Sequence, residues 1–160
     1  MTTVFTSAGE ASGDAYAAAI VNELKLIGVD ANFRGIGARK SRAAGIELGC
    51  DSSAWGAIGI TQSIRVAPRV IAGYRKAKAA LESTPPGLFV AIDFGYLNIR
   101  LVRLAKSLGW KTLYFIPPGS WRKDRQGADL PHLCDAIVTP FPWSRDLLAQ
   151  MGANVFFFGH

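Results

Sequence analysis

The chain of 160 residues has the length of one domain, because a domain usually contains about 100–200 residues. Hydrophobic residues make up 49% and charged residues 19%, which excludes a disordered chain, and no apolar run reaches the ~18–20 residues that span a bilayer. The formal net charge of +6 favours an anionic partner: nucleic acid, an anionic membrane surface or a phosphorylated ligand.

Strands and helices are predicted to alternate along the chain. The first part reads as a strand at residues 4–6, a helix over 17–27, a strand at 31–34, a short helix at 39–44 and a strand at 46–48. The second part reads as a helix over 62–82, a strand at 88–93, a helix over 97–108, strands at 112–116 and 136–139, a helix over 143–151 and a strand at 155–158. This order predicts an α/β fold, a Rossmann-like doubly wound parallel sheet in a single domain spanning residues 1–160.

The loop over residues 7–14, after the first strand, differs from the glycine fingerprint of dinucleotide-binding proteins. Its two carboxylates, Glu10 and Asp14, would repel a phosphate at the start of the next helix, so no pyrophosphate cradle is expected. Glu10 is a candidate for substrate contact or acid–base chemistry. Ser12 or Asp14 is expected to cap the helix that follows.

Later loops contain further polar residues that are candidates for contact with a ligand. Asp93 ends a buried strand, and ligands of parallel sheets bind at the carboxyl ends of strands, although a helix-capping role is an equal alternative. Asn98 follows five residues later, so both could face one cleft. Arg122 and Arg125 lie three residues apart and suit phosphate or carboxylate binding on a helix, with a solvated run of charges as the alternative.

The long helix predicted over residues 62–82 is strongly basic. Arg65, Arg69 and Lys76 fall on one helical face, and an apolar, glycine-rich segment with Trp55 and Ile58 precedes them. Apolar and basic residues together indicate a surface for a membrane or an acyl-phosphate ligand, with ordinary core and a solvated face as the alternative. Nucleic acid is not expected, because the basic residues lack interleaved aromatics and a known binding motif.

Several stretches, taken in order, resemble the motifs of one enzyme family. The most specific is Ala8-Gly9-Glu10-Ala11-Ser12-Gly13-Asp14, and the others are residues 33–37, Asp93 with residues 97–101, and Trp121-Arg122 with Arg125. They resemble the motifs AGEASGD, F-x-G-x-G, I-D-x-P-D-F-N-x-R-L and W-R-x-x-R of lipid-A-disaccharide synthases, which are glycosyltransferases of the two-domain GT-B type.

The resemblance implies a fold and a function. The chain would correspond to the N-terminal, acceptor-side half of a GT-B fold. The family transfers a diacylated glucosamine from a UDP-activated donor to diacylglucosamine 1-phosphate, without a metal or a further cofactor. It acts in the cytoplasm, peripherally at the inner membrane. The nucleotide-binding domain would be absent from this chain, and a separate chain could supply that C-terminal half.

The resemblance also implies roles for individual residues. Catalytic roles are expected for Asp93 and Glu10. Substrate-binding roles are expected for Ser12, Gly13, Asn98, Trp121, Arg122 and Arg125. Membrane-facing or lipid-facing roles are expected for Trp55, Ile58, Arg65, Arg69 and Lys76.

Some family positions carry different residues here. Tyr96 stands where the family has its second Asp, a candidate acid–base group, and a phenol is a far weaker base at neutral pH than a carboxylate. Gln62 and Ser144 replace two family glutamates. These differences keep a second function open: a non-catalytic, degenerate domain that binds an acyl-phosphate sugar or an anionic membrane surface.

Overall fold

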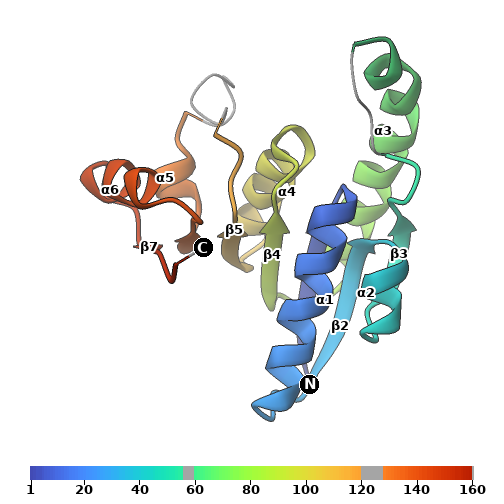
Figure 1. The fold of residues 1–160 in the computed structure, drawn as a ribbon. Coiled ribbons are helices and arrows are strands. Elements are labelled where there is room, and N and C mark those ends of the chain that lie inside the picture. Colours follow the sequence, from blue (N-terminus) through green and yellow to red (C-terminus); the bar gives the residue numbers. More distant parts are fainter. Residues whose placement is uncertain (56–59, 120–127, 160) are drawn as a thin grey trace.

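The computed structural model describes residues 1–55, 60–119 and 128–159. Its elements, in chain order, are β1 (Thr2–Ala8), α1 (Ala11–Leu26), β2 (Ala31–Gly37), α2 (Arg39–Ala43), β3 (Glu47–Asp51), α3 (Ile60–Ser83), β4 (Leu88–Ile92), α4 (Gly95–Ser107), β5 (Lys111–Phe115), α5 (Leu130–Leu133), β6 (Ala136–Val138), α6 (Pro142–Gln150) and β7 (Val155–Phe156). They alternate as the sequence predicts (Figure 1).

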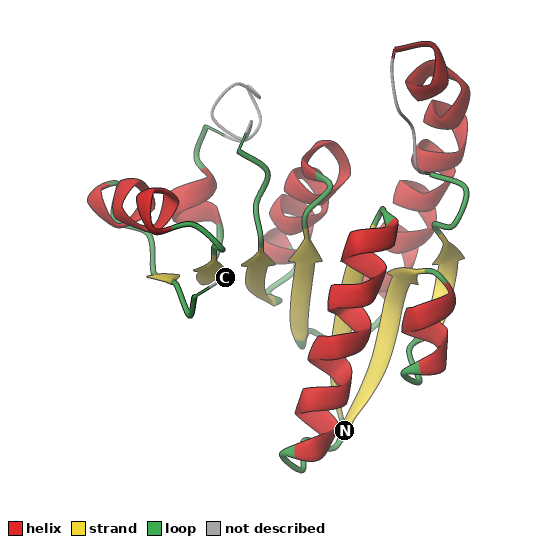
Figure 2. Cartoon of the chain, in the orientation of Figure 1, coloured by secondary structure: helices red, strands yellow, loops and turns green. Residues whose placement is uncertain are grey.

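The strands form one parallel sheet in the order β3-β2-β1-β4-β5-β6-β7. Helices α1 and α2 cover one face, while α3, α4, α5 and α6 pack against the other (Figure 2). The Rossmann-like, doubly wound α/β fold predicted from the sequence is therefore confirmed. Because all strands are parallel, their carboxyl ends meet at one edge, where ligands of such sheets bind.

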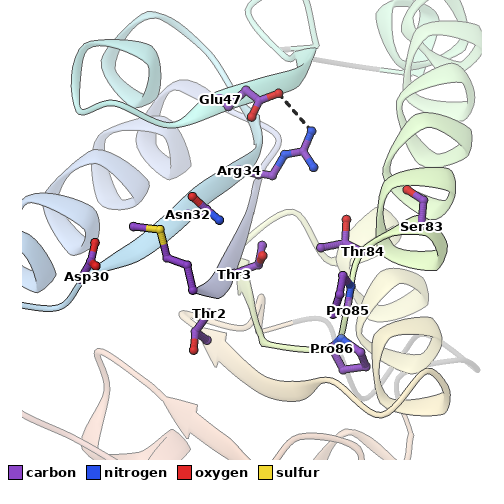
Figure 3. Close-up of a pocket in the computed structure, with 11 residues that line it drawn as sticks. Thr2, Thr3, Asp30, Asn32, Arg34, Glu47, Ser83, Thr84, Pro85 and Pro86 are labelled. Atoms are coloured by element: carbon purple, nitrogen blue, oxygen red, sulfur yellow. Dashed lines mark hydrogen bonds and ion pairs between the residues drawn. The ribbon is translucent and has the colours of Figure 1, made fainter.

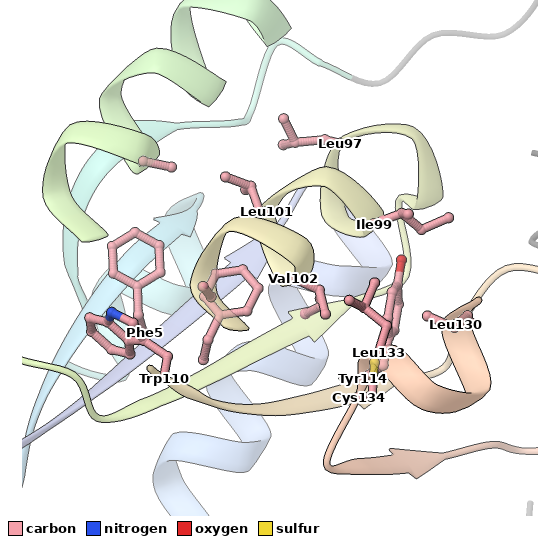
Figure 4. Packing of buried hydrophobic residues seen from close by; sticks show 14 of the residues in the cluster. Phe5, Leu97, Ile99, Leu101, Val102, Trp110, Tyr114, Leu130, Leu133 and Cys134 are labelled. Atoms are coloured by element: carbon pink, nitrogen blue, oxygen red, sulfur yellow. The ribbon is translucent and has the colours of Figure 1, made fainter. Parts of the chain in front are cut away.

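The larger part of the core lies between the sheet and α3 to α6. Phe5 and Phe89 stack with ring centroids 5.9 Å apart, and the ring of Trp110 meets Phe5 edge-on at 6.4 Å. Leu101 and Val102 of α4 are fully buried in the same cluster (Figure 4). This packing fixes α4 against β4, and so fixes the turn that joins them.

Some predicted boundaries are wrong. Helix α1 begins at Ala11, so the predicted loop over residues 7–14 shortens to Gly9 and Glu10. The last strand ends at Phe156, and Phe158 beyond it is 81% exposed. The four-residue helix α5, which begins with a leucine and a proline, was not predicted, because four residues are too few for an apolar period to emerge.

Among the described residues, one half of the face that carries α1 and α2 is only partly covered. Leu113, Phe115 and Val138 are only half-buried there, and Phe156 on β7 is 41% exposed. The register places Phe115, Val138 and Phe156 in one row across three strands. Figure 1 shows α1 in front of β1 and β2, and its Tyr16 reaches the near edge of this half, where its ring centroid lies 5.5 Å from that of Phe115. We call these four residues the open sheet face.

Among the helices of the described residues, none combines the length and the apolar character needed to cross a membrane.

Candidate functional site

The two expected catalytic carboxylates follow neighbouring strands at the carboxyl edge of the sheet. Ala8, the last residue of β1, pairs in register with Ile92, the last residue of β4. Glu10 therefore follows one strand end and Asp93 the other. Glu10 is exposed and Asp93 is half-buried, so both carboxylates belong to surface loops that a substrate can reach.

A close approach between the two loops explains the glycine at position 9. A Cβ atom built on Gly9 would lie 2.3 Å from Cγ of Phe94, far inside van der Waals contact. Phe94 also lies beside the indole of Trp55, with ring centroids 5.9 Å apart. The loop after β1 is thus held directly against the turn after β4.

The turn after β4 has an unusual backbone. Asp93 and Phe94 have φ angles of 47° and 45°, in the left-handed region that costs L-residues roughly 1–2 kcal/mol each. Ile116, just beyond the neighbouring strand β5, has a φ of 58°. Such backbone strain persists only where the surrounding structure holds it, and it often marks functional sites.

The Asn98 side chain is wholly buried beneath this turn. Its Nδ2 donates hydrogen bonds to the carbonyl oxygens of Ile92 at 2.9 Å and Asp93 at 2.8 Å, and also lies 3.1 Å from that of Ser7. Its Oδ1 accepts a hydrogen bond from Ser7 Oγ at 2.6 Å. The expectation that Asn98 faces a cleft with Asp93 is therefore corrected, because both polar atoms of its amide are engaged inside the protein.

Asp14 does not cap its own helix, which corrects the expected role. Its carboxylate accepts hydrogen bonds from the backbone N–H groups of Ala38 at 2.6 Å, Lys40 at 2.9 Å and Ser41 at 3.0 Å, all at the start of α2. Burial acts to raise the pKa of Asp14, but the hydrogen bonds from α2 outweigh it and hold that pKa below its usual value. Asp14 therefore joins α1 to α2.

The other expected substrate-binding residues divide into two groups. Ser12 is exposed in the first turn of α1, beside Glu10, whereas Gly13 is buried, and a Cβ there would meet Ala8 at an ordinary contact distance of 3.4 Å. Residues Trp121, Arg122 and Arg125 lie outside the described part of the chain. Their predicted contact with an anionic group stays a prediction.

The expectation that Trp55 faces a membrane is wrong. Its side chain is only 3% exposed, because Gly73 on α3 leaves room for the indole: a Cβ at that position would lie 2.3 Å from the ring. Arg69 and Lys76 are exposed on α3, two helical turns apart, as expected. Ile58 and the side chain of Arg65 lie outside the described part of the structure.

Tyr96, in the first turn of α4, is 68% exposed at the same edge. The guanidinium of Arg100 lies over its ring, 4.1 Å from the ring centroid, and also donates to the Tyr96 carbonyl oxygen. The phenol and the guanidinium thus form one unit at the start of α4, which follows the turn at Asp93.

Two residues that hold the site were not singled out from the sequence. Ser7 bonds Asn98, and Tyr114 Oη donates to the Asp93 carbonyl oxygen at 2.9 Å. Both stand inside strands, where a sequence pattern reports only which face a side chain occupies. Their partners become visible only once the strands are paired.

An open hollow of about 1070 Å³ lies at the opposite edge of the sheet (Figure 3). Residues that begin the strands, among them Thr2 and Asn32, line it together with the loop before β4. Its arginine, Arg34, is paired with Glu47 at 3.0 Å. The strands that the structure describes all begin at this edge, so the opposite, carboxyl edge remains the candidate site.

A comparison with protein families identifies the family of this sequence. The sequence model of the family described as "Lipid-A-disaccharide synthetase" matches residues 4–160. The chain belongs to the lipid-A-disaccharide synthase family. A lipid-A-disaccharide synthase of Nitrosococcus oceani is 33% identical over 154 residues, covering 96% of this chain and 40% of the relative. A second, of Trichlorobacter lovleyi, is 35% identical over 159 residues, covering 98% of this chain and 41% of the relative.

The chain thus spans about 40% of the length of these synthases. The segment from Ala8 to Asp14, which resembles the synthase motif, provides the Gly9 contact to Phe94, the exposed Glu10 and the Asp14 link to α2. In this member of the synthase family, the motif therefore builds the carboxyl edge of the sheet.

Proposed function

We propose that the chain is the acceptor-binding portion of a lipid A glycosyltransferase. In this proposal, the enzyme transfers a diacylated glucosamine from a UDP-activated donor to diacylglucosamine 1-phosphate. The single observation that carries it is the close approach, at the carboxyl edge, of the family's most specific segment to the turn formed by Asp93 and Phe94. Glu10 and Asp93 are the groups that contact the acceptor hydroxyl and accept its proton as it attacks the donor sugar.

Acceptor binding gives a direct test. Calorimetric titration would use diacylglucosamine 1-phosphate in detergent micelles, with unphosphorylated diacylglucosamine as the control ligand. Saturable binding of the phosphorylated sugar is expected, weakened about tenfold or more by Asp93→Ala, because a hydrogen bond to a charged group is lost. Asp30→Ala, at an exposed carboxylate of the opposite edge, is the matched control and should bind like the wild type. Absence of saturable binding would refute the proposal.

The exposed basic face of α3 is proposed as the surface that meets an anionic membrane. Arg69 and Lys76 supply the charge, and the beginning of α3 extends past the carboxyl ends of the strands in Figure 1. A lipid acceptor held at that edge would then keep its acyl chains near the bilayer. Basic residues near an anionic surface contribute about 1 kcal/mol each.

Vesicle co-sedimentation tests this surface. Lys76→Glu should lower the partition coefficient onto vesicles containing phosphatidylglycerol by about tenfold, since a charge is reversed at the surface. Lys111→Glu changes the same charge at an exposed lysine of the opposite edge and should have little effect. If both variants lower the partition coefficient equally, the net charge of the protein and not the basic face of α3 would account for binding, and the proposal would be rejected.

The open sheet face is proposed to dock the part of the synthase that this chain does not contain. The relatives carry about 60% of their length beyond the match, and Phe115, Val138 and Phe156 offer an apolar row for a helix of that part. The test is co-purification with the remainder of the Nitrosococcus oceani relative. Phe156→Asp should abolish the complex, Met151→Asp just after α6 should not, and retention by both variants would refute the docking surface.

Tyr96 favours one alternative function. Its phenol stands in place of the family's second Asp and is covered by the guanidinium of Arg100. A binding-only domain would recognise the acyl-phosphate sugar without transferring it. Such a domain would bind the phosphorylated sugar in the titration described above but would not support sugar transfer. A transfer assay therefore distinguishes the two functions.

A further inference from the structure

We propose that Asn98, together with Ser7, is a positioning pair for Asp93. The pair holds the turn at Asp93 and Phe94 in its left-handed conformation and ties that turn to the loop carrying Glu10. The reaction that the pair serves rests on the function proposed above, whereas the positioning can be tested without it.

The hydrogen bonds of Asn98 converge on the two strand ends that carry the carboxylates. Its Nδ2 donates to the carbonyl oxygens of Ile92 and Asp93, the two peptide groups that flank the start of the turn. Its Oδ1 accepts from Ser7 Oγ on β1. One buried amide therefore fixes β4, β1 and α4 to one another where the candidate loops begin.

The carbonyl oxygen of Asp93 accepts a second hydrogen bond, from a residue of β5. Tyr114 Oη, on the neighbouring strand β5, donates to the Asp93 oxygen at 2.9 Å, and Asn98 Nδ2 donates to it at 2.8 Å. The peptide group after Asp93 thus cannot rotate without losing both bonds. This fixes the direction in which the Asp93 side chain leaves the backbone, without any contact between Asn98 and a substrate.

The partners of the Asn98 amide explain why a left-handed turn persists at two non-glycine residues. Burial leaves Asn98 and Ser7 without water, so each depends on the other and on the turn for its hydrogen bonds. If the turn relaxed to a common backbone conformation, the carbonyl of Asp93 would move and the amide would lose a partner. The turn and the pair therefore stabilise each other.

Backbone chemical shifts of Asp93, Phe94, Gly9 and Glu10 in isotopically labelled protein report this arrangement. Asn98→Ala and the milder Ser7→Ala should both move the Asp93 and Phe94 carbon shifts away from left-handed values. The matched control is Thr112→Val, which removes a buried, hydrogen-bonded hydroxyl at the start of β5, on the opposite edge. It should lower stability while leaving all four sets of shifts in place.

The outcomes separate positioning from a general loss of stability and from the proposed function. Unchanged Asp93 and Phe94 shifts in Ser7→Ala, or equal changes in Thr112→Val, would overturn the inference; if Asn98→Ala does not fold, Ser7→Ala decides. In the acceptor titration, Ser7→Ala should raise Kd about tenfold and Thr112→Val should not. If the wild type binds no acceptor, the proposed function fails, and the shift comparison alone decides on the positioning.

Discussion

The carboxylate of Asp14, in the first turn of α1, lies 2.6 Å from the amide nitrogen of Ala38 at the start of α2. Ala38 occupies the N-cap position of α2 and has no side-chain acceptor of its own. Asp14 supplies that acceptor from α1. One residue of the family motif therefore ties together α1 and α2, which cover the same face of the sheet.

Replacing Asp14 should therefore destabilise the fold. Asp14→Ala leaves N–H groups at the start of α2 without a partner and should lower the free energy of unfolding by about 2–3 kcal/mol. Urea unfolding measures this change. Asp30→Ala, at an exposed carboxylate, serves as the control and should change it by less than about 0.5 kcal/mol.

The same carboxylate predicts a pH dependence of stability. Because the pKa of Asp14 is lowered in the folded state, its contribution is fully present above the usual carboxyl pKa of about 4 and is lost as pH falls below that value. The stability difference between wild type and Asp14→Asn should be constant from pH 5 to 7, on the order of 1 kcal/mol, and shrink below pH 4. A difference that stays constant down to pH 2 would contradict this account.

Gly9→Ala should destabilise the chain by about 1–3 kcal/mol, because its methyl group would overlap the ring of Phe94. Gly119→Ala is the control, since a Cβ there meets no atom of the described residues within 4 Å. In a double-mutant cycle, Phe94→Ala should remove most of the added cost of Gly9→Ala. Strict additivity of the two changes would mean that the two loops do not touch.

Because Trp55 is buried and Trp143 is exposed, replacing them should change the free energy of unfolding by different amounts. Trp55→Ala should cost about 3–5 kcal/mol of unfolding free energy, since it opens a cavity against α3. Trp143→Ala, at a side chain that is 67% exposed, should cost less than about 1 kcal/mol. Similar costs in urea unfolding would show that Trp55 is not part of the core.

Cys134 should resist thiol reagents in the folded protein. Burial raises the pKa of this thiol to about 12, so almost no thiolate is present at pH 8. The stability that accompanies this shift is present below the usual thiol pKa of about 8.5 and is lost as pH rises above it. In labelling at pH 8, the Cys50→Ala variant should react only after unfolding in urea, and rapid labelling without urea would contradict the burial.

The sequence predicted the order of elements because apolar spacing and glycine or proline breaks are local signals. It placed Asp93 and Glu10 at the carboxyl edge of the sheet, since parallel strands bring their carboxyl ends together. It misplaced Trp55 and Asn98, whose burial depends on Gly73 and Ser7, residues distant in the chain. The capping partner of Asp14 lies 24 residues away on another helix, beyond any local pattern.

Sugar transfer by a chimeric enzyme tests the central claim most directly. In this chimera the chain replaces the matching 40% of the Nitrosococcus oceani relative, and release of UDP is followed with diacylglucosamine 1-phosphate as acceptor. The account predicts acceptor-dependent release that Asp93→Ala lowers by about 10²–10⁴-fold, the usual contribution of a general base, while Asp30→Ala retains it. Full turnover in Asp93→Ala, or no transfer by the chimera carrying the wild-type chain, would contradict it.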